Sequence, residues 1–404
     1  MIPVPEALER ILTRLHPVDS ETVPVVEAFG RVLTKDVAAC LTHPPAAISA
    51  MDGYAVRGED IATAPADLRL VGEAPAGGAY DEMVGPGQAV RIFTGGILPI
   101  GTNTVVIQEN TNAFDGTVRV LESTPIAKNV RAQGLDFAKG DIPLAAGRRL
   151  TARDVGLAAA MGLSTLKIRR RPRVAILCTG NELVPPGEVP GPNQIINSNG
   201  VSLAAVVAAA GGKPVDLGIA LDDAESLLRA AASSAGADLL VTVGGASVGN
   251  HDLVQSVLKK SGLEVDFWKV ALRPGKPLIS GILNGLPMLG LPGNPVSALV
   301  CALLFVRPAL EALLGIPNPS DGRITAELGR DLKANDQRED YVRSALERRE
   351  NGTLVATPFE LQDSSQLSTL ARADCLAIRQ PNAAAARTGD CIDVVPFTLG
   401  LDGY

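Results

Sequence analysis

Apolar residues recur at helical spacing in two segments of the first 170 residues. Leucine and isoleucine side chains three and four positions apart predict a helix over residues 4–16, and a similar spacing predicts another over residues 151–162. Thr151 is a suitable N-cap for the second helix, with Asp154 three residues later as its capping-box partner. We expect the second helix to pack on the first, which would join two separate segments in one domain.

Between these helices the pattern changes to short alternating runs. Valine- and isoleucine-bearing stretches at Gln88–Phe93, Thr104–Gln108 and Thr117–Leu121 are separated by glycine, proline and asparagine. This pattern predicts a β-rich domain inserted between the two helical segments.

After residue 170 the chain alternates continuous apolar runs with helical periodicity. Such alternation predicts a largely parallel sheet covered by helices on both faces. The expected strands are Arg173–Cys178, Val215–Leu221, Leu239–Val243, Val265–Leu272, Pro277–Leu283 and Leu286–Leu291, and the expected helices are Val201–Ala210, Ala224–Ser234 with Asp222 as its cap, Leu253–Lys260 and Val296–Leu314.

Short strands return in the last 85 or so residues, at Thr353–Thr357, Cys375–Arg379 and Cys391–Pro396, and predict a small β-barrel or sandwich. The fold class is therefore a multidomain α/β plus β protein. The predicted domains are an elongated mixed domain of residues 1–43 plus 132–170, a β-rich inserted domain of residues 44–131, an α/β domain of residues 171–316 and a C-terminal β-barrel of residues 317–404.

The composition narrows the possible functions. The 404 residues are 46% hydrophobic and 20% charged with a formal net charge of −7, which argues against wholesale binding to nucleic acid or a membrane surface. The basic run Arg169–Arg173 is better explained as a solvated linker. Acidic residues at the N-terminus do not fit a signal peptide and we find no apolar window of about 18 residues, so we expect a cytoplasmic protein. Five scattered cysteines without a C-x-x-C pair and three distant histidines disfavour a zinc site.

Four unusual loops follow strands of the α/β segment. Because loops that leave the carboxyl ends of parallel strands share one edge of the sheet, we expect them to converge on a ligand. The loops are Thr179–Glu182 (TGNE), Gly244–Gly249 (GGASVG), Arg273–Pro277 (RPGKP) and Leu291–Leu299 (LPGNPVSAL).

Two of these loops carry features of an anion site. Pro295 suits the first turn of the helix that it begins, and the free amides beside it favour an anion. Arg273 and Lys276 on the adjoining loop add cations whose attraction outweighs the helix dipole. A strand-to-helix turn stiffened by proline is the alternative for the Pro295 loop taken alone.

Three carboxylates at the same edge indicate a metal ion. Glu182, Asp222 and Asp252 would repel a bare anion, so we expect Mg²⁺ between these carboxylates and phosphate oxygens. Helix capping is the alternative for all three carboxylates, most of all for Asp222 and least for Glu182. The sequence has neither a G-x-x-x-x-G-K-S/T loop nor a G-x-G-x-x-G fingerprint, which disfavours the common nucleotide-binding enzymes.

A second set of polar loops lies in the β-rich segment, at Ser49–Arg57, Phe93–Gly96 and Arg131–Asp136. An acid before glycine, such as Asp52, can simply form a turn. Three such loops within one small domain favour a functional site.

These motifs resemble one known family. SAMDGYAVRGED, RIFTGG, VAILCTGNELV, GGASVGNHD, LRPGKPLISG and LPGNPVSALV occur in this order over nearly the whole chain. They are similar to the molybdopterin molybdenumtransferase (MoeA) family, which is related to the E domain of gephyrin. The resemblance implies a homodimer of elongated, L-shaped, four-domain subunits whose α/β domain resembles molybdopterin adenylyltransferase, itself a candidate partner. It also implies the conversion of adenylated molybdopterin and molybdate to molybdenum cofactor and AMP, with Mg²⁺.

The loops and the resemblance together assign candidate residues. The implied catalytic residues are Asp52, Thr94, Asp136, Glu182, Asp252 and Lys276. The implied ligand-binding residues are Gly180, Gly244, Gly245, Ser247, Gly249, Arg273, Pro274, Gly275, Lys276, Pro292, Gly293, Asn294, Pro295, Arg338, Arg343, Ser364 and Ser365, and the implied metal ligands are Glu182, Asp222 and Asp252.

Two residues depart from the family pattern. Asn181 stands where members usually have Asp, and an amide is a poorer Mg²⁺ ligand. Arg273 replaces the usual lysine, which keeps the charge but changes its shape. Adenylyl transfer to molybdopterin and a non-catalytic scaffold of the gephyrin type are the alternative functions.

Overall fold

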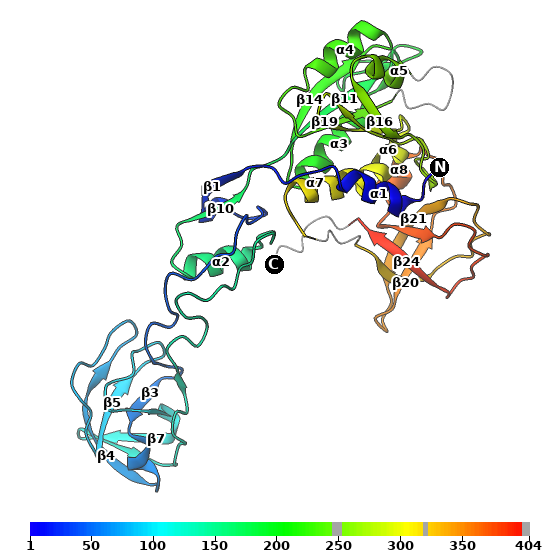
Figure 1. Cartoon of the computed structure of the whole chain (residues 1–404). Coiled ribbons are helices and arrows are strands. Elements are labelled where there is room, and N and C mark those ends of the chain that lie inside the picture. Colours follow the sequence, from blue (N-terminus) through cyan, green and yellow to red (C-terminus); the bar gives the residue numbers. More distant parts are fainter. Residues whose placement is uncertain (245–252, 318–321, 398–404) are drawn as a thin grey trace.

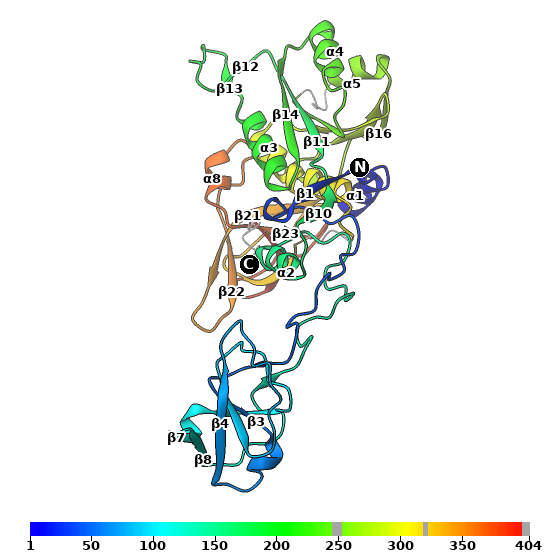
Figure 2. The same ribbon diagram turned by 90° about the vertical axis from the view of Figure 1, so that its left-hand side faces the viewer.

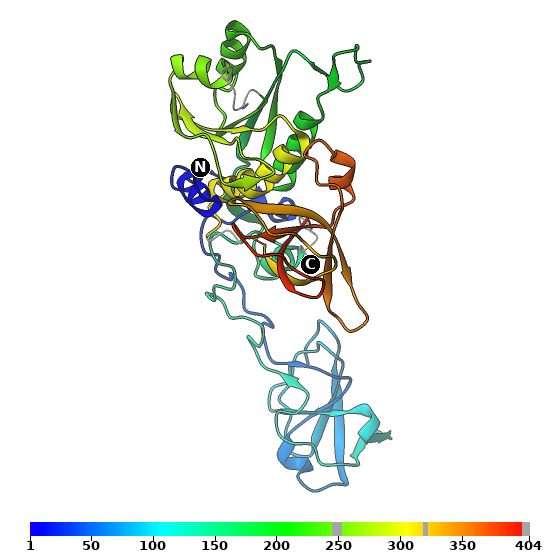
Figure 3. The same cartoon turned by 90° about the vertical axis from the view of Figure 1, so that its right-hand side faces the viewer.

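The computed structural model describes residues 1–244, 253–317 and 322–397. The molecule is elongated, with an α/β sheet at one end, a β-rich domain at the other and a small barrel beside the α/β sheet (Figures 1–3). Two stretches of chain run between the α/β end and the β-rich end.

A six-stranded sheet forms the centre of the α/β region. In spatial order its strands are β14 (Lys213–Ala220), β11 (Arg173–Thr179), β15 (Leu239–Val243), β19 (Leu286–Leu291), β18 (Ile279–Leu283) and β16 (Leu263–Phe267). The first four run parallel, whereas β18 is antiparallel to both of its neighbours. The predicted strand Val265–Leu272 is wrong at its end, because β16 stops at Phe267 and Leu272–Arg273 (β17) joins another sheet.

Helices cover both faces of this sheet. Alternate residues of β11 point to opposite sides, with Val174 and Ile176 in one apolar cluster and Ala175 and Leu177 in another. The first face is covered by α3 (Ser198–Ala209) and the second by α4 (Ala224–Ala232) and α5 (Leu253–Lys260). The prediction of a sheet buried on both faces is confirmed.

A long apolar helix completes the first face. It consists of α6 (Pro295–Cys301), a π-helical turn (Ala302–Val306) and α7 (Arg307–Leu313). Within the described ranges it is the one helix that is long and apolar enough to cross a membrane, so our expectation that no such window exists is wrong. Its 18-residue window is 72% buried inside the protein, where it fills the core of the α/β region.

The N-terminal helix α1 (Val4–Leu12) ends before the predicted residue 16. Its buried residues Val4, Ala7 and Ile11 pack with α7 and the π-helical turn in the α/β core. The predicted packing of the two N-terminal helices on each other is therefore wrong. An apolar stripe shows which side of a helix is buried but not which element covers it.

The connecting region has a small core of its own. It contains α2 (Ala152–Ala160), the 3-10 helix η1 (Val25–Glu27) and a ladder of β1 (Ser20–Pro24) with β10 (Thr165–Arg169). Thr151 caps α2 and forms a reciprocal capping box with Asp154, as predicted.

The β-rich domain is a six-stranded sheet with apolar clusters on both sides. In spatial order its strands are β6 (Thr104–Ile107), β3 (Gly53–Val56), β5 (Gln88–Ile92), β4 (Ala66–Ala74), β8 (Thr117–Val120) and β7 (Thr111–Phe114), with the 3-10 helices η2 (Gly58–Ile61) and η3 (Gln108–Asn110) between strands. The short pair β2 (Ile48–Ser49) and β9 (Val130–Arg131) lies where the chain enters and leaves the domain.

The C-terminal strands close into a barrel. They are β20 (Ile324–Leu328), β21 (Glu339–Arg348), β22 (Leu354–Pro358), β23 (Cys375–Arg379) and β24 (Cys391–Pro396), with α8 (Leu367–Ala371) beside them. Strand β21 pairs with both β22 and β23, which completes the ring. Strand β17 pairs in parallel with β21 and so ties the barrel to the α/β region. The predicted fold class is confirmed, whereas the domain boundaries remain a prediction.

Candidate active site

Four strand ends meet at one edge of the α/β sheet. The amide of Gly180, after β11, donates to the carbonyl of Ala220 at the end of β14 (3.2 Å). The amide of Gly244, after β15, donates to the carbonyl of Leu291 at the end of β19 (3.3 Å). The loops that leave these strands therefore start side by side, as expected for the carboxyl edge of a parallel sheet.

Glycine allows these loops to approach one another closely. Gly244 has a φ of +94°, and a Cβ atom there would lie 2.4 Å from the carbonyl oxygen of Thr179. A Cβ atom on Gly293 would lie 3.6 Å from the Cα atom of Gly244. A side chain at residue 244 would force the loops apart, so this position requires glycine.

A cavity of about 1000 Å³ opens between these loops. Apolar side chains and polar groups line it together, an arrangement that suits a flat ligand with polar substituents. Its lining residues are Cys178, Thr179, Gly180, Glu182, Leu183, Ile195, Ile196, Asn197, Ser198, Asn199, Asp222, Val243, Gly244, Ser256, Pro277, Pro292, Gly293, Asn294, Pro295 and Ser365.

Two of the predicted carboxylates, Glu182 and Asp222, face this cavity. The predicted cap of α4 is wrong by one residue, because the Asp223 carboxylate accepts the bond from the Ser226 amide (2.7 Å). Asp222 instead has its backbone amide bound by the side-chain oxygen of Asn181 (3.0 Å). The capping alternative for Asp222 is thereby removed, and Asn181 acts as a backbone anchor for the loop that carries Asp222.

The LPGNP loop is held by the C-terminal region. Asn294 donates from its side-chain amide to the Ser364 hydroxyl (2.7 Å), and the Val296 amide donates to the Ser364 carbonyl (3.1 Å). Pro295 has no amide hydrogen and Val296 is already paired, so the helix start offers fewer free amides than we predicted. Ser365, the next residue, reaches the cavity.

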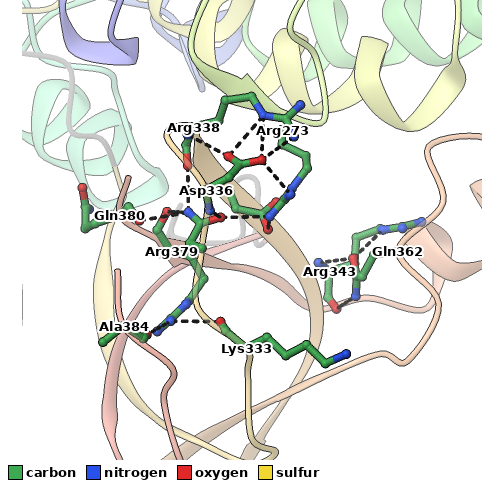
Figure 4. A network of polar contacts seen from close by, with 11 residues as sticks. Arg273, Lys333, Asp336, Arg338, Arg343, Gln362, Arg379, Gln380 and Ala384 are labelled. Carbon is green, nitrogen blue, oxygen red and sulfur yellow. Dashed lines mark hydrogen bonds and ion pairs between the residues drawn. The ribbon is translucent and has the colours of Figure 1, made fainter. Parts of the chain in front are cut away.

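Arg273 faces away from this cavity. Its guanidinium binds Asp340 and Asp336, the latter at 3.2 Å, and Asn335 at 2.9 Å (Figure 4). The bond to Asp340 raises the pKa of Arg273, and Arg338 lowers the pKa of Asp336 to about 2. Arg273 lines a separate cavity of about 340 Å³ whose wall also contains Arg330, Lys333 and Arg379.

The rest of the RPGKP loop packs under the LPGNP helix. A Cβ atom on Gly275, which has a φ of +117°, would lie 2.6 Å from Sγ of Cys301 in α6. Pro274 stands between Arg273 and Gly275, and Lys276 is partly buried. Pro277 lines the 1000 Å³ cavity whereas Lys276 does not, within the part of the chain that the structure describes.

Arg343 is almost fully buried, with 1% of its surface exposed. Its side chain donates to the Gln362 side-chain oxygen (3.1 Å) and to the carbonyls of Gln366 (3.2 Å) and Leu361 (3.5 Å). Burial lowers the pKa of Arg343. These bonds hold the loop that presents Ser364 and Ser365 to the LPGNP helix.

Two candidate residues of the β-rich domain, Asp52 and Thr94, contact each other directly. Both the amide and the hydroxyl of Thr94 donate to the same Asp52 carboxylate oxygen at 2.8 Å. These bonds lower the pKa of Asp52, with a smaller contribution from Arg91. A Cβ atom on Gly53 would lie 1.9 Å from the carbonyl oxygen of Val106, so glycine is needed where the chain leaves Asp52.

The three polar loops of this domain are neighbours. Ser49 and the loop after β5 exchange backbone bonds, from Ser49 to the Gly96 carbonyl and from Gly95 to the Ser49 carbonyl, both 2.9 Å. The β2–β9 pair joins the first loop to Arg131, which begins the third. Asp136 is exposed farther along this third loop.

The two groups of candidate residues lie at opposite ends of the folded molecule. All three views place the β-rich sheet far from the α/β sheet (Figures 1–3). Asp52 and Thr94 are therefore separated from Glu182 and Asp222 within one chain, and Asp136 lies where the chain returns to the connecting region. The predicted residues Gly245, Ser247, Gly249 and Asp252 lie outside the described residues.

Comparisons with known proteins agree with this architecture. Three family profiles match, namely the MoeA N-terminal region (domain I and II) at residues 2–162, a probable molybdopterin binding domain at residues 175–312 and the MoeA C-terminal region (domain IV) at residues 325–397. Molybdopterin molybdenumtransferase of Haemophilus influenzae is 33% identical over 401 residues, which cover 98% of this chain and 99% of the relative. The chain belongs to the MoeA family. The family predicted from the six motifs is thus confirmed.

Further members of the MoeA family support the same conclusion. Molybdopterin molybdenumtransferase of Nostoc sp. is 36% identical and covers 89% of this chain and 85% of its own. A crystal structure of the molybdopterin biosynthesis MoeA protein from Pyrococcus horikoshii is 27% identical, with a TM-score of 0.85 over 98% of this chain and 100% of that chain.

The cavity of this MoeA-family chain suits a magnesium ion that arrives with a phosphate. Glu182 and Asp222 both line the cavity and carry carboxylate oxygens that could bind Mg²⁺, and the described residues contain no group of three or more His, Cys, Asp or Glu that could hold a metal. Mg²⁺ usually keeps several waters and takes one or two carboxylates plus substrate phosphates. Two carboxylates are therefore a sufficient protein contribution.

The sequence motifs did not predict the α3 side of the cavity. Asn197 caps α3 by accepting from the Gly200 amide (3.1 Å), and Asn199 donates to the Gly293 carbonyl (2.7 Å). The helix starts at Ser198, earlier than the predicted Val201. The Asn-Ser-Asn-Gly run before the apolar residues could have revealed the cap, but a cap signal does not show that its neighbours face a ligand.

Proposed function

We propose that this MoeA-family protein inserts molybdate into adenylated molybdopterin and releases AMP, with Mg²⁺ as the metal ion. The names of its relatives favour this reaction over adenylyl transfer and over a scaffold role. The observation that carries the proposal is the 1000 Å³ cavity, where two carboxylates, the LPGNP loop and Ser365 meet at the carboxyl edge of the sheet.

In this proposal the two sides of the cavity have separate tasks. The apolar side chains of Leu183 and Ile195 contact the flat pterin or adenine, and the polar edge binds phosphate. Glu182 and Asp222 hold Mg²⁺, which neutralises negative charge on the phosphate when bound. Gly180 and Gly244 allow the backbone to approach the ligand closely.

Molybdate is proposed to bind near Lys276 rather than at Arg273. The charge of Arg273 is compensated by Asp336 and Asp340, so its attraction for an oxyanion is reduced. Arg343 contributes indirectly, since it holds the loop of Ser364 and Ser365.

We propose a homodimer in which the β-rich domain of one subunit faces the α/β cavity of the other. Two-fold symmetry would then build two equal sites, each with Asp52 and Thr94 from one chain and Glu182 from the other. The wide separation of these residues within one chain supports this arrangement.

The five cysteines are free, which supports a reducing, cytoplasmic location.

The test is to incubate the full chain with adenylated molybdopterin, molybdate and Mg²⁺ and to measure AMP release and active cofactor, the latter by reconstituting a molybdoenzyme that lacks it. We expect AMP release to depend on molybdate. ATP consumption with molybdopterin would indicate adenylyl transfer instead. Failure to bind either AMP or molybdate in titration calorimetry would indicate a scaffold.

A further inference from the structure

Arg91 connects the two loops that form the Asp52–Thr94 pair. Residue 91 lies on β5, three residues before Thr94, and is opposite Tyr54 on β3. Its guanidinium donates to the Gly53 carbonyl (3.2 Å), directly after Asp52. The carbon at the centre of the guanidinium lies 4.9 Å from the ring centroid of Phe93, directly before Thr94.

A third segment joins this arrangement through Gln108. Arg91 donates to the Gln108 side-chain oxygen (2.7 Å), and the Gln108 backbone amide donates to the Asp52 carbonyl (3.1 Å). The Arg91 guanidinium also lies 5.1 Å from the ring centroid of Tyr54. Arg91 is therefore bound to Gly53, the residue after Asp52, to Gln108, whose amide binds the Asp52 carbonyl, and to Phe93, the residue before Thr94.

We propose that Arg91 is the positioning residue of the Asp52–Thr94 pair, holding the loops of Gly53, Phe93 and Gln108 at the spacing that places the carboxylate for molybdenum insertion. This inference rests on the proposed function of Asp52. Arg91 acts through its neighbours, and its own side chain has four partners within the domain.

The shape of the arginine side chain suits this task. One edge of the planar guanidinium makes two bonds to different segments while its face contacts aromatic rings. A lysine keeps the charge but cannot make the same forked contact. Replacement by lysine therefore separates the contribution of charge from that of position.

Arg91 also adds an electrostatic effect at Asp52. The Thr94 bonds are the main cause of the lowered pKa of Asp52, and the Arg91 charge lowers it further. The surrounding elements carry Glu73, opposite Arg91 on β4, Glu109, which accepts a bond from Gln108, and Asp67 at the far end of β4, which is paired with Arg119. Loss of the Arg91 charge should therefore raise the pKa of Asp52.

The experiment compares Arg91→Gln and Arg91→Lys in the full chain. Arg119→Gln is the matched control, because Arg119 also contacts an aromatic ring, Phe114 at 5.5 Å, in the same sheet. For each variant, kinetics give kcat and KM for adenylated molybdopterin and the pH profile of kcat/KM. NMR follows the titration of the Asp52 carboxyl carbon and the position of the Thr94 amide signal. The melting temperature measures stability.

We expect Arg91→Gln to lower kcat about tenfold, since small errors in placement have large effects on rate, with a smaller change in KM. The Thr94 amide signal should move, and the acid limb of the profile should move to higher pH. Arg91→Lys should restore the acid limb but not the full kcat, and Arg119→Gln should match the unmodified protein.

Three results test the positioning role of Arg91 and separate it from the proposed function of Asp52. Unchanged Asp52 and Thr94 signals in Arg91→Gln would overturn the positioning role, even where activity falls through a lower melting temperature. An unchanged kcat in Arg91→Gln, in a protein that Asp52→Asn inactivates, would overturn it as well. If Asp52→Asn is fully active while Arg91→Gln still shifts the Asp52 titration, the positioning role stands and the proposed function of Asp52 fails.

Discussion

Asp52 and Thr94 show how hydrogen bonds from one residue lower the pKa of an exposed carboxylate. Two bonds to one carboxylate oxygen favour the ionised form and lower the pKa of Asp52. A group whose pKa is lowered on folding contributes stability above its unfolded pKa, about 3.9, and loses it as the pH falls through the folded value. The pair therefore extends the pH range in which Asp52 is ionised toward lower pH.

Substitution of Thr94 tests this pair. Thr94→Val removes the hydroxyl bond but keeps the amide, so the pKa of Asp52 should rise and the acid limb of kcat/KM should move to higher pH. Thr94→Ser retains both bonds and is the control. Identical pH profiles for the valine and serine variants would show that the hydroxyl does not set the charge of Asp52.

The two cations of the RPGKP loop should behave differently. Lys276→Ala should lower the rate at limiting molybdate at least about tenfold, or ~1.4 kcal/mol, if Lys276 attracts the oxyanion. Arg273→Ala should instead lower the melting temperature, because it leaves Asp340 without its guanidinium partner and removes one of the two that bind Asp336. Rates as a function of molybdate concentration, together with thermal unfolding, separate the two effects. Equal losses of molybdate affinity in both variants would contradict the distinction.

At the scale of elements, hydrophobic periodicity predicted most strands and helices of the α/β region. The apolar runs of β11, β15 and β19 were sufficient because both faces of these strands are buried. The partner of α1 could not be predicted, since its apolar stripe fits any apolar surface. The end of β16 at Phe267 was missed because the apolar residues continue beyond it into a segment that pairs with the barrel.

The two aspartates at the start of α4 should have different roles, Asp223 in stability and Asp222 in activity. Asp223→Ala removes the side-chain cap and should lower the free energy of unfolding by about 1 kcal/mol, with activity retained. Asp222→Asn should lower activity at limiting Mg²⁺ and leave stability unchanged, because Asp222 faces the cavity. Denaturant unfolding and Mg²⁺-dependent rates measure the two quantities. A stability loss in Asp222→Asn that equals the loss in Asp223→Ala would restore the predicted cap.

At the scale of the whole molecule, the sequence predicted loops that meet within each domain but not the placement of one domain relative to another. The α/β loops converge because they leave one sheet, which strand order alone can anticipate. The β-rich domain is joined to the rest of the molecule by two connecting segments. Its orientation depends on contacts such as the β1–β10 ladder, and no sequence motif marks these contacts. Six ordered motifs therefore indicated one family, whereas a single chain holds their residues in two separate places.

Mixing inactive subunits tests whether two chains build each site. Asp52→Asn disables the β-rich half of a site and Glu182→Gln disables the α/β half. In a mixed dimer with shared sites, one site receives both defects and the other receives none. Random assortment should then restore roughly a quarter of the unmodified activity, because half of the dimers are mixed and each has one of two sites intact.

The matched control uses two defects in the same half. Glu182→Gln mixed with Asp222→Asn leaves a damaged α/β cavity in every site, so its activity should stay at the level of the separate variants. Subunits with two different affinity tags, co-expressed and purified through both, give the mixed dimer directly. If that dimer of Asp52→Asn and Glu182→Gln is as inactive as the control, the two groups of residues do not share a site across the subunits.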